Sequence, residues 1–148
     1  MARVLVIDDD EAYSVFLTTL LVRGGHEVFS LRNGRFLARL IAAEPFDAII
    51  TNLYMPETDG IEVLRCAKKL VPSAVVIAIT GGAVTSGARA ARADDCVHRL
   101  MSVLGAAAVL TKPINGEALL DILRSALDSP RTPEWTDELR DDDAERSE

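Results

Sequence analysis

Polar side chains that are able to bind a metal ion or a phosphoryl group follow four short apolar runs of the sequence. These segments are Asp8-Asp9-Asp10, Thr51-Asn52, Thr80-Gly81 and Thr111-Lys112. Clustered carboxylates repel one another unless a cation is present, and Mg²⁺ accepts one or two carboxylates while keeping several waters. A hydroxyl and a lysine are groups that stabilise the equatorial oxygens of a phosphoryl group in transfer. The residue types therefore predict a phosphoryl site with Mg²⁺, if the fold brings the four segments together.

Apolar runs that are typical of strands alternate with stretches of helical spacing over residues 1–129. The runs cover residues 4–7, 28–31, 48–50, 75–79 and 107–110. The helical stripes that we expect between and after them are Val15, Phe16, Thr19 and Leu20; Phe36, Leu37, Leu40 and Ile41; Ile61, Val63, Leu64 and Ala67; Val97, Leu100, Met101 and Leu104; and Leu119, Ile122, Leu123 and Ala126. Gly24-Gly25 is expected to end the first helix, and Asn115 to cap the last.

The alternation of strand and helix predicts the fold class. Five repeats of strand and helix indicate right-handed crossovers and a three-layer, doubly wound α/β sandwich around a five-stranded parallel sheet. The first and fourth runs are almost continuously apolar, which is expected of strands covered on both faces. Ligands of such sheets bind beyond the carboxyl ends of the strands, where the strand order switches. We therefore expect the four polar segments to meet at one edge of the sheet.

Composition excludes several classes of protein. The chain has 148 residues, of which 49% are hydrophobic, and a net charge of −7. No apolar run approaches the roughly 20 residues of a membrane span, and the acidic balance argues against direct nucleic-acid binding. Cys66 and Cys96 form neither a disulfide framework nor a metal spacing, and the N-terminus lacks a signal peptide. A cytoplasmic protein without a membrane partner is expected.

Residues 130–148 are expected to form an acidic tail outside the domain of residues 1–129. The tail carries eight acidic residues and three arginines, so it holds −5 of the net charge of −7. Trp135 and Leu139 are its only large apolar residues. The composition favours a solvated tail. The alternative is a short helix over about residues 132–140 that docks Trp135 onto the domain or a partner, and the sequence leaves both open.

Taken together, these segments resemble the receiver domain of bacterial two-component response regulators, over about residues 2–128. The resemblance is carried by Asp8-Asp9, by the segment Leu53-Tyr54-Met55-Pro56-Glu57-Thr58-Asp59-Gly60, by Thr80 and by Lys112-Pro113. It implies a flavodoxin-like, chemotaxis-regulator-like (βα)5 fold. It also implies a role in phosphorelay signal transduction, with a histidine kinase or phosphotransfer protein as one partner and an effector as another.

The resemblance also implies a role for the residue that precedes Leu53. In the family this residue is the aspartate that accepts the phosphoryl group, whereas here it is Asn52. An amide is not a nucleophile, so the chain as written is not expected to be phosphorylated. Asn52 is either natural or a substitution introduced to prevent phosphorylation, and the sequence leaves both open.

Further site residues follow from the resemblance alone. Asp9 corresponds to a direct ligand of Mg²⁺ and Asp8 to a ligand through water; the backbone carbonyl of Tyr54 and the side-chain carbonyl of Asn52 supply further oxygens. The metal affinity is expected to be weakened, because a carboxylate is missing from the pocket. The residues that correspond to the phosphoryl-binding groups are Thr80, Gly81 and Lys112.

Two departures from the family affect the expected mechanism. The family usually has an aromatic switch residue three positions before the lysine, where this chain has Val109, which has no ring to turn inward. In addition, 32 positions separate Thr80 from Lys112, which is more than the family's usual spacing. The extra residues fall within 81–104, and they form either an unusual signalling surface or lid, or a tolerated surface insertion.

Three functions remain in competition. The first is a stand-alone receiver that acts through protein–protein contact with a separate effector. Receivers often pair through the fourth-helix face, so a homodimer of this kind is one alternative. The stand-alone receiver would not be an enzyme, although a receiver with aspartate at position 52 would catalyse its own phosphoryl transfer. The second is a natural pseudo-receiver, a docking scaffold independent of phosphorylation. The third, a nucleotide- or flavin-binding α/β enzyme, is disfavoured because the chain lacks G-x-G-x-x-G after the first strand and a P-loop.

Overall fold

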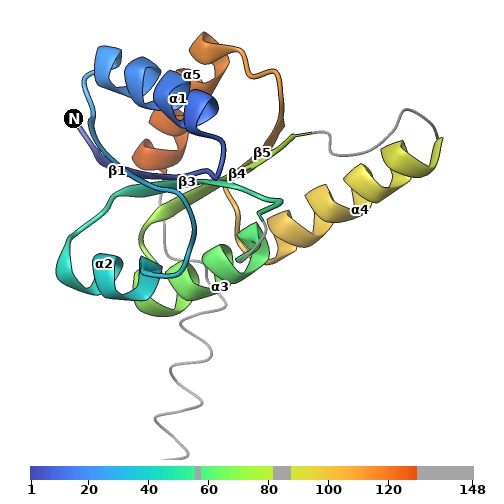
Figure 1. Ribbon diagram of the computed structural model, residues 1–148, viewed down its shortest axis with the longest axis horizontal. Coiled ribbons are helices and arrows are strands. Elements are labelled where there is room, and N and C mark those ends of the chain that lie inside the picture. The colour runs from blue at the N-terminus through green and yellow to red at the C-terminus, as the bar shows by residue number, and fades with distance from the viewer. Residues whose placement is uncertain (56–57, 82–87, 130–148) are drawn as a thin grey trace, which may run out of the picture.

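Five strands and five helices alternate along the chain (Figure 1). The computed structural model describes residues 1–55, 58–81 and 88–129, and for residues 88–95 the backbone alone. The elements are β1 (Arg3–Ile7), α1 (Glu11–Arg23), β2 (Glu27–Leu31), α2 (Leu37–Ala43), β3 (Ala48–Asn52), α3 (Gly60–Leu70), β4 (Val75–Thr80), α4 (Ala88–Val103), β5 (Ala108–Thr111) and α5 (Gly116–Asp128).

The strands form one parallel sheet in the order β2-β1-β3-β4-β5. One row across the sheet joins Ser30, Val6, Ile50, Ile77 and Ala108 as successive partners. The chain runs from β1 outward to β2 and then returns to place β3 on the other side of β1. The predicted doubly wound (βα)5 fold is therefore confirmed, and its switch point lies between β1 and β3.

Helices cover both faces of the sheet, which gives the three predicted layers (Figure 1). One core cluster packs α1 and α5 against the sheet, with Leu17 and Leu123 among its buried members. The other packs α2, α3 and α4 against the opposite face, with Leu64 and Met101 among its buried members. Every residue of β3 and β4 is buried, and so are the last four residues of β1, as expected of central parallel strands.

The predicted stripe of the first helix is wrong in its position around α1. Val15 is 59% exposed and Phe16 is 42% exposed, whereas Leu17 and Leu21 are buried. The helix carries apolar residues on nearly all sides, so the sequence pattern contains two overlapping stripes with helical spacing. Only packing against the sheet selects between them.

The ends of α1 and α5 lie where the sequence predicts them. Asn115 is the N-cap of α5, as predicted, and its side chain accepts a hydrogen bond from the backbone N–H of Ala118 at 3.2 Å. Helix α1 ends at the C-cap Gly24, and Gly25 follows with φ +90°, a left-handed conformation that glycine adopts without strain. The second predicted stripe is correct at Leu37 and Ile41, which are buried, while Phe36 is 56% exposed.

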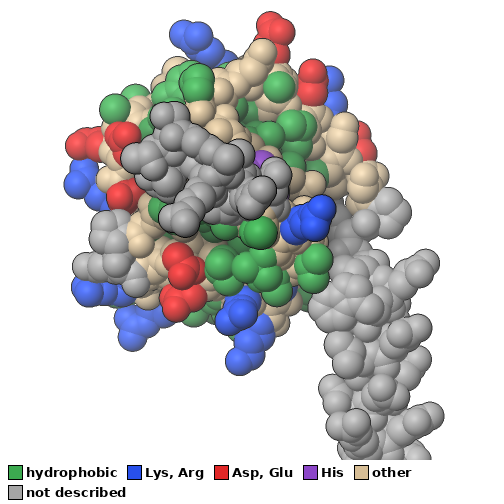
Figure 2. Space-filling model, turned by 90° about the vertical axis from the view of Figure 1, so that its right-hand side faces the viewer, with side chains coloured by type: hydrophobic (Ala, Val, Ile, Leu, Met, Phe, Trp, Pro, Cys, Tyr) green, Lys and Arg blue, Asp and Glu red, His purple; other side chains and the backbone are tan. Residues whose placement is uncertain are grey.

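Helix α4 extends away from the body of the molecule in Figure 1. Among its described side chains Met101 alone is buried, whereas Leu100 is 43% exposed and Val103 is 80% exposed. Figure 2 shows apolar side chains gathered on this side of the molecule. Residues 82–87, within the predicted insertion, and the predicted tail of residues 130–148 lie outside the described residues.

None of the helices in the described ranges combines the length and the apolar character that a membrane span requires.

Candidate functional site

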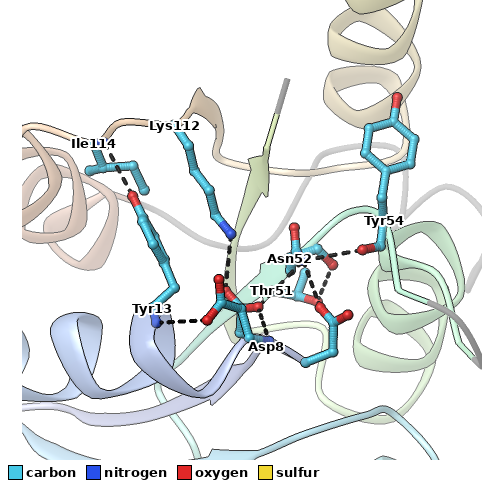
Figure 3. A network of polar contacts seen from close by, with 9 residues as sticks. Asp8, Tyr13, Thr51, Asn52, Tyr54, Lys112 and Ile114 are labelled. Carbon is cyan, nitrogen blue, oxygen red and sulfur yellow. Dashed lines mark hydrogen bonds and ion pairs between the residues drawn. The ribbon is translucent and has the colours of Figure 1, made fainter. Parts of the chain in front are cut away.

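The four polar segments lie at the carboxyl edge of the sheet, near the switch point. Figure 3 shows Asp8, Asn52 and Lys112 there. Asp8 follows β1, Asn52 ends β3, Thr80 ends β4 and Lys112 follows β5. The edge is held together by backbone hydrogen bonds, including one of 2.9 Å from the Lys112 N–H to the Thr80 carbonyl. Asp8, Asn52 and Thr80 are all buried, so this part of the site is shielded from water, whereas Asp9 is exposed.

Asp8 is a buried carboxylate with a cationic neighbour. Its Oδ2 lies 3.4 Å from Lys112 Nζ, and its Oδ1 accepts a hydrogen bond of 2.9 Å from the backbone N–H of Asp10. Burial raises the pKa of Asp8 above its usual value, and the nearby negative charge of Asp9 adds to this. The Asp10 N–H and the charge of Lys112 act in the opposite direction. The lysine thus favours the ionised carboxylate in a place where burial disfavours it.

Asn52 lies in the middle of an oxygen cluster. Its Nδ2 lies 3.0 Å from Oδ1 of Asp9, 3.1 Å from the backbone carbonyl of Tyr54 and 3.4 Å from Oδ1 of Asp8. Its own Oδ1 is buried and has no hydrogen-bond partner within the described part of the chain. In Figure 3 Asn52 and Asp8 face one another, with Lys112 on the other side of Asp8.

The segments that follow β1 and β3 determine which other groups belong to the oxygen cluster. Asp10, the third member of the predicted carboxylate cluster, is the N-cap of α1 and accepts from the Tyr13 N–H at 3.3 Å. It therefore belongs to the helix start and not to the oxygen cluster. The segment after Asn52 returns close to the strand, where the Gly60 N–H donates to the Leu53 carbonyl at 2.8 Å. This return places the backbone carbonyl of Tyr54 near Asn52, while the Tyr54 side chain is 42% exposed.

Tyr13 is a site neighbour that the sequence did not indicate. Lys112 Nζ lies 4.0 Å from the centroid of its ring, a cation–π contact. The Tyr13 hydroxyl accepts a hydrogen bond of 3.2 Å from the Ile114 N–H, just beyond the cis peptide bond of Lys112-Pro113. Tyr13 therefore links α1 to the segment that carries the lysine. No motif contains this tyrosine, because the contact depends on how α1 lies over the sheet edge.

The remaining predicted residues lie beside this cluster. Thr80 is fully buried at the end of β4, and Gly81 follows it in an exposed position. Val109 lies in β5, partly buried against the core that contains Met101. The cavity bordered by Lys68, Val75, Ala107 and other residues lies at the opposite edge of the sheet, so it is separate from the candidate site.

The oxygens of the cluster fit Mg²⁺ in type. Asp8 and Asp9 supply carboxylates and Tyr54 a backbone carbonyl, which are hard ligands of the kind that Mg²⁺ takes. Within the described ranges, however, no three His, Cys, Asp or Glu side chains are grouped so that they could hold a metal ion. The position that would complete such a group holds the Asn52 amide.

Comparison with solved structures places the fold among receivers. A response regulator receiver domain protein from Clostridium thermocellum is 28% identical with a TM-score of 0.74, covering 86% of this chain and 95% of that one. A CheY-like receiver domain protein from Methanospirillum hungatei is 29% identical with a TM-score of 0.70, covering 86% and 94%.

Sequence relatives agree with the structural ones. The response regulator receiver protein CpdR of Brucella abortus is 35% identical over 86 residues, which is 58% of this chain and 72% of that relative. The receiver protein Anae109_2439 of Anaeromyxobacter is 31% identical over 122 residues, which is 82% of this chain but 47% of that relative. The chain thus spans less than half of some relatives that it matches. A family model, the response regulator receiver domain, matches residues 4–124, and the chain belongs to this family.

Proposed function

We propose that this chain acts as a receiver in two-component phosphorelay signalling and that it is not phosphorylated as written. Receiver domains are in general signalling modules that interact with kinases and effectors. The observation that carries the second part of the proposal is the position of Asn52, which ends β3 within reach of Asp8, Asp9 and the Tyr54 carbonyl. We propose that this is the position of the phosphoacceptor.

The chemistry of Asn52 excludes the usual covalent step. Formation of an aspartyl-phosphate requires a carboxylate oxygen to attack phosphorus, and the amide oxygen of Asn52 carries no formal charge. The residues that we propose to bind a transferred phosphoryl group lie at the same edge of the sheet. Lys112 Nζ lies at the edge of the cluster, 3.4 Å from Asp8, and Thr80 ends the neighbouring strand. Gly81 follows Thr80 in an exposed position.

Receiver domains typically bind Mg²⁺ at their acidic pocket, and we propose that this one does so weakly. Asp9 and the Tyr54 carbonyl would be direct ligands, Asp8 a ligand through water, and Asn52 a ligand through Oδ1. When bound, Mg²⁺ would supply positive charge to phosphoryl oxygens. Three carboxylates attract a dication more strongly than two, so the replacement of one by an amide lowers the affinity.

The partners proposed are a histidine kinase or phosphotransfer protein and a separate effector, in the cytoplasm. The match to CpdR covers 72% of that relative, so that protein is itself little longer than one receiver, which supports a stand-alone role here. The NtrC4 receiver, 27% identical with a TM-score of 0.72, is described as a dimer in its activated form. A homodimer through α4 is proposed on this ground, with Leu100 and Val103 as exposed apolar contacts. Val109 supplies no aromatic ring for a switch at this face.

A second candidate function is a docking scaffold that is independent of phosphorylation. It is favoured by the contacts of the Asn52 amide, whose nitrogen faces all three oxygens of the cluster. A pocket satisfied in this way does not need a phosphoryl group or a metal ion to be stable. The signalling surface would then have a fixed form. The family membership favours both of these functions over the nucleotide- or flavin-binding enzyme.

Labelling with a small phosphodonor distinguishes the two candidates. The chain and its Asn52→Asp variant are incubated with acetyl phosphate and Mg²⁺, and the products are read by intact mass. Asn33→Asp is a matched control, because it makes the same chemical change in the loop before α2. We expect one phosphoryl adduct on Asn52→Asp and none on the unchanged chain or on Asn33→Asp.

The other outcomes are equally informative. If Asn52→Asp folds but accepts no phosphoryl group, the pocket has lost its chemistry and the scaffold function is supported. If the unchanged chain is labelled, Asn52 is not the residue that decides phosphorylation, and the proposal is wrong.

A further inference from the structure

The Asn52 amide nitrogen has the oxygen neighbours that a metal ion would have. The acceptors are Asp9 Oδ1 at 3.0 Å, the Tyr54 carbonyl at 3.1 Å and Asp8 Oδ1 at 3.4 Å. They come from the end of β1 and from the segment after β3, so the amide joins two parts of the chain that are distant in sequence. An amide nitrogen carries two hydrogens, each with a partial positive charge, and it shares them among the three oxygens.

We infer that the Asn52 amide takes the place of the divalent cation in this pocket, so that the receiver fold is stable without metal and the amide opposes metal binding. The inference rests on the proposed function, which identifies Asp8, Asp9 and the Tyr54 carbonyl as the cation ligands. It goes beyond a lowered affinity from lost charge, because the amide occupies the space between the ligands as well as lacking a carboxylate.

The unpartnered atom of the same side chain supports this inference. Asn52 is only 8% exposed, and its Oδ1 is buried with no hydrogen-bond partner among the residues that the structure describes. If the amide were turned over, Oδ1 would satisfy no donor either, and it would face two carboxylates and a carbonyl. Four oxygens without a donor or a cation between them repel one another. The observed orientation is therefore the stable one for the metal-free chain.

The turned-over amide becomes favourable only with a cation. In that orientation Oδ1 joins the oxygens of Asp9 and Tyr54 as a hard ligand, and the positive charge removes the repulsion. The two orientations of Asn52 thus correspond to a metal-free and a metal-bound pocket. Turning the amide over would break the contacts of Nδ2 with these oxygens, which would oppose the binding of Mg²⁺.

An aspartate at position 52 would behave in the opposite way. It has no N–H to donate, so three carboxylates would face one another, at the buried positions 8 and 52 and at the exposed Asp9, where only Lys112 offers a side-chain positive charge among the described contacts. The Asn52→Asp variant is therefore expected to depend on metal for stability, which the unchanged chain does not.

Thermal unfolding with and without Mg²⁺ tests this inference. The chain, Asn52→Asp and Asn52→Ala are compared in a chelator and in millimolar Mg²⁺, with Asn33→Asp as the charge control, and Mg²⁺ affinity is measured by calorimetry. We expect the Tm of the unchanged chain and of Asn33→Asp to respond little to Mg²⁺. Asn52→Asp is expected to have the lower Tm in chelator, to regain stability with Mg²⁺, and to bind Mg²⁺ at least about tenfold more tightly.

Asn52→Ala separates the contacts of the amide from the charge of an aspartate. It adds no charge, yet it leaves the oxygens of Asp8, Asp9 and Tyr54 without the amide N–H groups. We expect it to be less stable than the unchanged chain in chelator, and to regain part of that stability with Mg²⁺. Where Asn52→Ala does not fold, a ¹⁵N NMR spectrum of the unchanged chain supplies the same information. The Asn52 side-chain N–H₂ signals should then be protected from solvent exchange in chelator.

The inference is overturned if Mg²⁺ stabilises the unchanged chain as much as Asn52→Asp, or if Asn52→Ala is as stable as the unchanged chain in chelator. It is also overturned if the Asn52 N–H₂ signals exchange freely. Its failure can be told apart from that of the proposed function. If Asn52→Asp gains metal binding but is not labelled by acetyl phosphate, the inference is supported and the phosphorelay proposal is wrong. If Asn52→Asp is labelled but binds Mg²⁺ no more tightly than the unchanged chain, the phosphorelay proposal is supported and the inference about the amide is wrong.

Discussion

Lys112 Nζ lies 3.4 Å from Asp8 Oδ2, which joins the residue after β5 to the residue after β1 across the carboxyl edge of the sheet. The Asp8 side chain is 1% exposed and the Lys112 side chain 17%. The pair is therefore almost shielded from solvent, and the lysine ammonium also lies over the Tyr13 ring. A pair in this setting is sensitive to the loss of one partner, because the other charge is left buried.

Removal of the lysine charge is expected to destabilise the protein. Lys112→Met keeps an apolar chain beside Tyr13 but leaves the Asp8 carboxylate without its cation. We expect the free energy of unfolding in urea to fall by roughly 1–3 kcal/mol. The double variant Asp8→Asn/Lys112→Met is the control, because it removes both charges, and it should lose less than the sum of the single changes. Additive losses would show that the two charges do not interact.

The close approach of α3 to the end of β3 predicts a difference between two glycines. A Cβ on Gly60 would lie 2.8 Å from Leu53 Cα and 3.0 Å from the Asn52 carbonyl oxygen, and both are backbone atoms that cannot easily move. Gly60→Ala is therefore expected to lower the free energy of unfolding by roughly 2 kcal/mol or more.

Gly81→Ala is the matched control near the same pocket. Its nearest neighbour would be Lys112 Cδ at 3.8 Å, an ordinary contact. We expect its free energy of unfolding to change by less than about 1 kcal/mol in either direction. If Gly60→Ala lowers the free energy of unfolding as little as Gly81→Ala does, the backbone at Gly60 moves to admit the methyl group, and the prediction is wrong.

The stability of the protein is expected to depend on pH through His26, which lies at the edge of the sheet opposite the candidate site. Its Nδ1 accepts a hydrogen bond of 3.1 Å from the Ala2 N–H. Burial lowers the pKa of His26, and the positive charges of the N-terminus and Arg124 lower it further. Because the unfolded chain then binds the proton more tightly, stability from this group is complete above about pH 6.5 and is lost as the pH falls toward the folded pKa.

A series of urea unfolding curves between pH 5 and pH 8 measures this dependence. The variant His26→Asn removes the titration and keeps a side-chain oxygen near the position of Nδ1. We expect the chain to lose more stability than His26→Asn on acidification, by less than roughly 1.4 kcal/mol per pH unit. Parallel profiles for the two proteins would contradict the lowered pKa.

Local patterns in the sequence were enough to predict the sheet and the residues at its carboxyl edge. The runs of β1, β3 and β4 are apolar because both faces of these strands are covered, and this property is written in consecutive residues. Asn115 at the start of α5 and Gly24-Gly25 at the end of α1 act on their own helices, so they too can be recognised locally. Parallel strands then bring their carboxyl ends to one edge, which places Asp8, Asn52, Thr80 and Lys112 together.

Contacts between elements were decided only by the tertiary structure. The buried side of α1 is that of Leu17 and Leu21, because the sheet covers one of two apolar stripes that its sequence offers. Tyr13 meets Lys112 because α1 crosses the edge of the sheet, a relation between residues 99 positions apart. The direction of the Asn52 amide was likewise unpredictable, since it depends on oxygens from two distant segments. A side chain's type is local, but its partners and its orientation depend on the field and packing that the whole fold creates.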